Sequence, residues 1–75
     1  MEKKLISAQE IVAKFNTPYQ TVNYYTALGL LPVAGKVGNK RLYEEPVIKE
    51  RLQKIADLAR EGYTLHLIRK RLLGM

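Results

Sequence analysis

Apolar residues recur at helical spacing in four segments of the chain, and residues that favour helix ends stand at the borders of these segments. The first segment covers residues 8–15. It follows Ser7, and Ser7 and Glu10 have the spacing of a capping box, in which each side chain accepts from the other residue's backbone amide. Ile6 and Ile11 are spaced to pack together as a hydrophobic staple. The pattern therefore predicts a capped helix over this segment.

The second helical segment follows the first after a short turn. Residues 16–18 combine an asparagine that tolerates a left-handed backbone, a threonine suited to the N-cap and a proline suited to the first helical position. Gln20 is spaced to complete a second capping box. We therefore predict a helix over residues 18–28 that Gly29 ends. Two capped helices joined by such a turn form a helix-turn-helix pattern.

A short stretch with turn-forming residues at its centre follows at residues 33–43. Gly38-Asn39 marks the expected tip of a β-hairpin, and basic residues stand on its flanks. Because a two-stranded hairpin is not stable alone, it must pack against the helices. A basic hairpin attached to a helix-turn-helix is a wing.

Two more helices complete the pattern. The third is expected after Glu44-Glu45, with Pro46 at its first position and Gly62 at its end. Its apolar half consists of Val47, Ile48, Leu52, Ile55, Ala56, Leu58 and Ala59. The fourth follows Thr64 as N-cap. Its apolar stripe consists of Leu65, Ile68 and Leu72.

These elements predict a mainly α fold, a winged helix-turn-helix with about four helices and a short two-stranded β-hairpin wing. Residues 1–75 are enough for a single domain. The sequence has no cysteine, so disulfides cannot stabilise so small a core. Stability must come from apolar packing and capped helices.

The charge of the chain narrows the choice of partner. Thirteen Lys and Arg residues against seven Asp and Glu give a net charge of +6, which points to a nucleic acid, an acidic membrane surface or an acidic protein. The helix over residues 18–28 has one face that is polar and aromatic but uncharged. That face consists of Tyr19, Gln20, Asn23, Tyr24 and Ala27. It suits base edges and phosphate oxygens, although an ordinary surface with partly buried tyrosines has the same pattern.

Several function classes do not fit this composition. The absence of cysteine and the single histidine, His66, argue against a metal or other cofactor. The sequence offers no nucleophile–base pair, no glycine-rich phosphate loop and no clustered carboxylates, so we do not expect an enzyme. It also has no run of about 18 apolar residues and no secretory signal at its start. We expect a cytoplasmic protein.

Three groups of residues carry a family resemblance. They are the run Thr21–Tyr25 followed by Gly29-Leu30-Leu31-Pro32, the run Lys40-Arg41-Leu42-Tyr43, and Glu61-Gly62-Tyr63-Thr64-Leu65. In order and spacing they resemble the DNA-binding domain of MerR-type bacterial transcription regulators. The resemblance extends over nearly the whole chain.

The resemblance implies double-stranded DNA as the partner. The helix over 18–28 would enter the major groove, and the hairpin over 33–43 would lie on the backbone. The residues implied near base edges are Tyr19, Gln20 and Asn23. The phosphate contacts expected from the resemblance and from side-chain chemistry are Thr17, Tyr24, Lys36, Lys40, Arg41, Tyr43, Tyr63, Thr64 and His66.

The chain departs from the family pattern at three places. The usual arginine of the recognition helix is Asn23, which removes one strong contact but keeps a side chain that reads adenine. The glutamate that usually follows the paired tyrosines is Thr26. Asn39-Lys40 replaces a Gly-Tyr pair in the wing. The target sequence therefore cannot be taken from relatives.

Other functions stay open beside transcription regulation. An excisionase-like or phage architectural protein uses the same fold to bend DNA, and some MerR-like domains act as adaptors that bind a co-chaperone. We expect the isolated domain to be a monomer, with a homodimer or side-by-side copies on DNA needed for useful affinity.

Family members continue into a dimerising helix and an effector domain, which these 75 residues do not include. The chain is therefore either an excised domain or a minimal protein. The run 69–71 is expected to be a solvated helix end that complements the helix dipole, with a second DNA site as the alternative.

Overall fold

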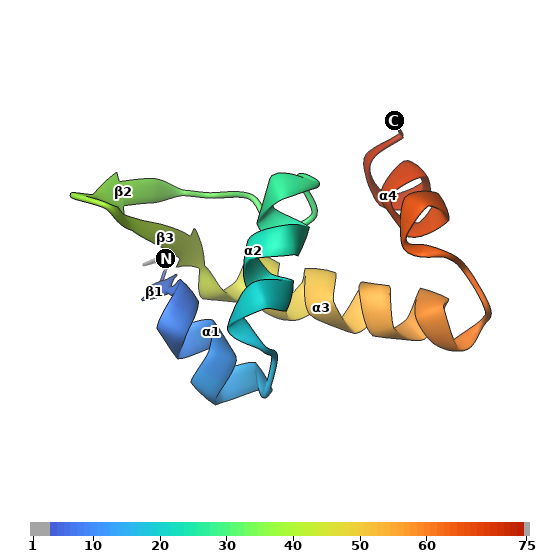
Figure 1. Cartoon of the computed structure of the whole chain (residues 1–75), viewed down its shortest axis with the longest axis horizontal. Coiled ribbons are helices and arrows are strands. Elements are labelled where there is room, and N and C mark those ends of the chain that lie inside the picture. Colours follow the sequence, from blue (N-terminus) through green and yellow to red (C-terminus); the bar gives the residue numbers. More distant parts are fainter. Residues whose placement is uncertain (1–3, 75) are drawn as a thin grey trace.

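Four helices and three short strands make up the part of the chain that the computed structural model describes, residues 4–74. In chain order they are β1 (Leu5–Ser7), α1 (Ala8–Phe15), α2 (Tyr19–Ala27), β2 (Gly35–Val37), β3 (Lys40–Glu44), α3 (Glu45–Arg60) and α4 (Leu65–Leu73). Figure 1 shows the hairpin of β2 and β3 extending to one side of α2, while α4 lies on the other side above the end of α3. The predicted winged helix-turn-helix with four helices is confirmed.

The start of α1 has the predicted capping box. The Ser7 amide donates to the Glu10 carboxylate at 3.0 Å, and the Glu10 amide donates to the Ser7 hydroxyl at 3.2 Å. Ile6 and Ile11 are both fully buried in the same apolar cluster, as a hydrophobic staple requires. The bounds of α1 are those predicted from the sequence.

Helix α2 begins one residue later than predicted and has no side-chain cap. Thr17 is not its N-cap, because the Thr17 hydroxyl donates instead to the Phe15 carbonyl at 3.2 Å. Pro18 takes the N-cap position with an extended backbone, ψ 144°. The second capping box expected from Gln20 does not form. Asn16 ends α1 with a left-handed backbone, φ 51°. Pro18 then precedes α2 with a non-helical backbone.

The sheet has three strands rather than the predicted two. β1 and β2 both pair antiparallel with β3, in the order β1-β3-β2. Ile6 lies opposite Tyr43, and Lys36 lies opposite Arg41. The hairpin turns at Gly38-Asn39, as predicted. β1 was missed because three residues are too few to show an alternating pattern.

Helix α3 begins at Glu45 rather than Pro46, and its buried face is narrower than predicted. Ala56 and Ala59 were placed in the apolar half but are exposed to solvent. A methyl group exposes little apolar area, so their position costs little stability. Thr64 caps α4 as predicted, and its hydroxyl accepts from the Leu67 amide at 3.3 Å.

The core consists of two apolar clusters that lie along α3. The first cluster contains Ile6, Ile11, Val22, Leu31, Tyr43 and Ile48. The second cluster contains Leu30, Ile55 and Ile68. Tyr25 packs against both clusters, and α3 contributes one isoleucine to the first and another to the second. Helices α2 and α4 are therefore connected through one continuous apolar layer.

Among residues 4–74, no helix is both long and apolar enough to span a membrane.

Candidate nucleic-acid interface

A groove of about 750 Å³ lies between α2, the start of α1 and the β2–β3 hairpin. Its lining residues come from all three elements: Ser7, Ala8, Gln9, Tyr19, Asn23, Lys36, Val37, Asn39, Lys40 and Arg41. The fold therefore brings two predicted base-reading residues and three predicted phosphate contacts to one surface, although they are far apart in the sequence.

The cations of the hairpin face one another rather than acidic partners. Lys36 on β2 lies directly opposite Arg41 on β3, and both side chains belong to exposed residues. Neither makes an ion pair within the part of the chain that the structure describes. Like charges directly opposite one another on a sheet destabilise it. A polyanion bound at this surface would relieve that repulsion.

The Glu10 carboxylate lies close to Lys40, the third cation of the hairpin. The pKa of Glu10 is lowered, first by the hydrogen bond from the Ser7 backbone amide and further by the positive charges of Lys40 and Lys14. Glu10 is committed to the capping box of α1. Its charge therefore reduces the positive potential at one edge of the groove without forming an ion pair with Lys40.

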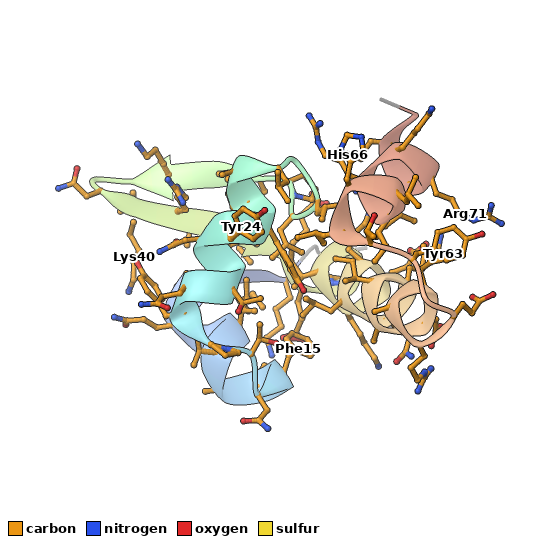
Figure 2. The ribbon with its side chains drawn as sticks, turned by 45° about the vertical axis from the view of Figure 1, so that its right-hand side comes forward. Phe15, Tyr24, Lys40, Tyr63, His66 and Arg71 are labelled. Carbon is orange, nitrogen blue, oxygen red and sulfur yellow. The ribbon has the colours of Figure 1, made fainter. Side chains whose placement is uncertain are left out.

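The outward face of α2 is exposed and uncharged, as predicted. Tyr19 is 52% exposed and Tyr24 is 56% exposed, whereas the neighbouring Tyr25 packs into the core. Gln20 is exposed and Asn23 is half-buried, and neither amide group is engaged by another described side chain. Figure 2 shows Tyr24 on the face of α2 that is turned away from α3. The amides of this face are therefore free to hydrogen-bond to a ligand.

Tyr43 does not belong to this surface, and its predicted role as a phosphate contact is wrong because the side chain is inside the core. Its side chain is fully buried in the first cluster. Its hydroxyl lies 2.8 Å from that of Thr26, which in turn donates to the Val22 carbonyl at 2.7 Å. Tyr43 therefore donates to Thr26 and ties β3 to α2. Thr26, where the resemblance led us to expect a glutamate, supplies the hydroxyl of this tie.

The second predicted wing contains Tyr63, Thr64 and His66, at the turn before α4 and at its start. His66 is exposed, whereas Tyr63 packs against the second cluster. The Arg71 guanidinium lies over the Tyr63 ring, with the Arg71 Cζ atom 5.7 Å from the ring centre. In Figure 2, Tyr63 and Arg71 lie on the far side of α4 from His66. These residues are close in sequence but do not form one contact surface with each other.

Two arginines that the sequence analysis did not place at the interface bind the end of α2. The Arg69 Nε–H of α4 donates to the Leu28 carbonyl at 2.8 Å. The Arg51 side chain of α3 donates to the Leu30 carbonyl at 3.2 Å. The expectation of a solvated run at 69–71 is therefore wrong for Arg69, which is half-buried. Spacing along one helix carries no signal for a contact with another helix.

No three His, Cys, Asp or Glu side chains gather into a metal-binding group within residues 4–74. The polar groups that line the groove are hydroxyl, amide, ammonium and guanidinium groups. These are the groups that proteins use toward phosphates and base edges.

Comparison with protein families matches residues 6–74 to the family described as MerR HTH family regulatory protein. Comparisons with curated proteins and with solved structures gave no match. The matched span runs from β1 to the end of α4, so it includes the groove, the hairpin and the helix-turn-helix. The chain therefore belongs to the MerR HTH family of regulatory proteins, which are DNA-binding regulators of transcription.

Proposed function

We propose that this domain binds double-stranded DNA in a sequence-specific way, with α2 in the major groove and the β2–β3 hairpin on the phosphate backbone. The observation that carries the proposal is the groove in which an uncharged helix face meets an unpaired cationic hairpin. A major groove about 12 Å wide admits an α-helix, so α2 can reach base edges while the hairpin stays outside.

Gln20 and Asn23 are the proposed readers of sequence. Glutamine and asparagine both pair with adenine through two hydrogen bonds in the major groove. The two residues are three positions apart on one face of α2, about 4.5 Å along the helix axis. This rise is close to the spacing of adjacent base pairs, about 3.4 Å. We therefore propose adenines at neighbouring positions of the target, with Tyr19 packing beside them.

The phosphate contacts come from the hairpin and from the ends of helices. Lys36, Lys40 and Arg41 supply the positive charge on one flank of α2. The first amides of α2 have no side-chain cap, which leaves them to bind a phosphate oxygen. The other proposed phosphate contacts are Thr17, Tyr24, Tyr63, Thr64 and His66.

A lone domain of this size binds DNA weakly, because few phosphates are neutralised. With four to six phosphate contacts the logarithm of the binding constant falls with the logarithm of salt at a slope of about −4 to −5. A second copy on the same duplex would raise the affinity through the combined contacts.

The test is an NMR titration of amide signals with a 20-base-pair duplex at low and moderate salt. We expect salt-sensitive shifts concentrated in residues 19–24 and 36–43. The absence of shifts at both salt concentrations would contradict the proposal and favour an adaptor that binds protein. Mobility of permuted-site duplexes in the same study separates a bending protein from a regulator that leaves DNA straight.

Charge-matched variants locate the contact. Arg41→Gln on the hairpin should weaken binding and reduce the salt slope by about 0.9. Lys49→Gln removes the same charge from the outer surface of α3, away from the groove lining. It should leave the slope unchanged. Equal effects of the two variants would show that binding depends on net charge alone.

A further inference from the structure

The C-terminal end of α2 is closed by a backbone motif that leaves the Leu28 carbonyl for an outside donor. The Leu30 amide donates to the Tyr25 carbonyl at 2.9 Å, and the Gly29 amide donates to the Thr26 carbonyl at 3.0 Å. With Gly29 at φ 82°, this is a Schellman motif. The Leu28 carbonyl lies at the negative end of the helix dipole, and α2 has no basic residue in its own last turn.

Arg69 of α4 supplies the missing positive charge. Its Nε–H lies 2.8 Å from the Leu28 carbonyl oxygen, in a partly buried position. A hydrogen bond from a guanidinium is about twice as strong as one between neutral groups, and a cation at this end of a helix is favourable. Arg51 of α3 adds a second bond, to the Leu30 carbonyl, two residues further along the chain.

Apolar contacts hold α4 in the position that this bond needs. Leu30 belongs to the second cluster together with Ile68, one residue before Arg69, and Leu28 packs against this cluster. At Gly29 a methyl group would come within 3.4 Å of the Leu73 side chain of α4. The end of α2 is therefore fixed by α4 through both packing and a charged hydrogen bond.

We infer that Arg69 is a positioning residue for DNA recognition, which sets the direction of α2 by holding its last carbonyl to α4. This inference rests on the proposed function. Two-point hydrogen bonding by Gln20 and Asn23 needs both side chains in register with the base edges, so a tilt of α2 weakens reading more than it weakens phosphate contacts. The loss of Arg69 then lowers the preference for the target sequence over other DNA. It leaves the attraction between the hairpin cations and the DNA phosphates intact.

The experiment starts from a duplex selected from a random pool by the wild-type chain. Dissociation constants for this duplex and a scrambled one are measured over a salt series. Arg69→Met keeps the length of the side chain and removes its donors, and Lys70→Met removes a charge from the next, exposed position of α4. We expect Arg69→Met to lower the selected-to-scrambled preference about tenfold, with an unchanged salt slope. Lys70→Met should keep the preference.

A direct phosphate contact by Arg69 would give another result. Both duplexes would then bind more weakly by the same factor, and the salt slope would fall by about 0.9. That outcome, or an unchanged preference, overturns the inference. Arg69→Lys keeps the charge and a donor group, and it should recover part of the lost preference.

A measurement on the wild-type chain covers the case in which Arg69→Met does not fold. The Arg69 Nε–H signal should be protected from solvent exchange and should keep its position when DNA is added, whereas the Arg41 Nε–H signal should shift. A large shift of the Arg69 signal contradicts the inference. If the wild-type chain shows no DNA binding, the proposed function fails. If it binds but Arg69→Met keeps the preference, only the positioning role fails.

Discussion

Replacing Tyr43 with phenylalanine removes one hydroxyl that the family resemblance places on a phosphate and the structure places in the core. The Tyr43 side chain is fully buried, and its hydroxyl lies 2.8 Å from that of Thr26. Because the Thr26 hydroxyl donates to the Val22 carbonyl, the Tyr43 hydroxyl is the donor between the two side chains. Phenylalanine fills the same space and leaves no buried donor without a partner.

The expected cost follows from this geometry. Loss of one neutral hydrogen bond lowers the free energy of unfolding by about 1 kcal/mol. In a domain of this size such a change lowers Tm by about 4–8 °C. Thr26→Val is worse, because it leaves the buried Tyr43 hydroxyl without an acceptor, at a cost of about 1–3 kcal/mol. The double variant should lose less than the sum of the two single variants.

Thermal unfolding and DNA titration of the same proteins show whether the Tyr43 hydroxyl stabilises the core or contacts a phosphate. Tyr43→Phe should keep the wild-type affinity for DNA and the same salt slope. Tyr24→Phe is the matched control, because Tyr24 is 56% exposed and its hydroxyl has no partner within the described residues. It should keep the wild-type Tm and weaken DNA binding. A Tyr43→Phe protein with unchanged Tm and weakened DNA binding would refute this reasoning.

Three further substitutions test local features of the fold. Ser7→Ala removes half of the capping box and should lower the free energy of unfolding by about 1 kcal/mol, measured by urea denaturation; an unchanged midpoint would show that α1 does not depend on its cap. Gly29→Ala places a methyl group at φ 82° and should cost about 1–2 kcal/mol by the same assay, whereas a stabilised variant would show that the Schellman turn is not needed. The hydrogen bond from Lys14 lowers the pKa of Glu45, so the charged carboxylate favours the folded state above the ordinary glutamate pKa, and this contribution is lost as the pH falls below it. Glu45→Gln should therefore lose less stability on acidification than the wild-type chain, and parallel pH profiles of Tm would contradict the ion pair.

Features decided within one turn of the chain were predictable from the sequence. The capping box of Ser7 and Glu10, the cap at Thr64 and the tip of the hairpin depend on residues a few positions apart. The same holds for the uncharged face of α2, since helical spacing alone places Tyr24 outside and Tyr25 inside. The exception is Thr17. Its hydroxyl can accept from an amide of α2 or donate to a carbonyl of the preceding turn, and it donates to the Phe15 carbonyl.

Features that join distant segments were not predictable. β1 is visible only through its pairing with β3, because three residues carry no pattern of their own. The Tyr43 hydroxyl is chemically suited to bind a phosphate, and only the packing of the first cluster shows that it lies in the core. Arg69 stands in a basic run, and only the position of α4 against the end of α2 shows that it is a hydrogen-bond donor to backbone.

Helix α2, the proposed recognition helix, is held in place mainly by contacts from other elements. α2 has nine residues, no side-chain cap and no charged residue, and a helix this short is marginal in isolation. Three side chains from other elements hold its C-terminal end: Tyr43 of the sheet bonds to Thr26, Arg69 of α4 bonds to the Leu28 carbonyl, and Arg51 of α3 bonds to the Leu30 carbonyl just beyond the helix. These bonds use none of the outward face, so substitutions on that face leave them intact. Under the proposed function, substitutions at Gln20 or Asn23 should change the target sequence without loss of the fold, whereas substitutions at Tyr43, Arg69 or Arg51 should change the position of the whole helix.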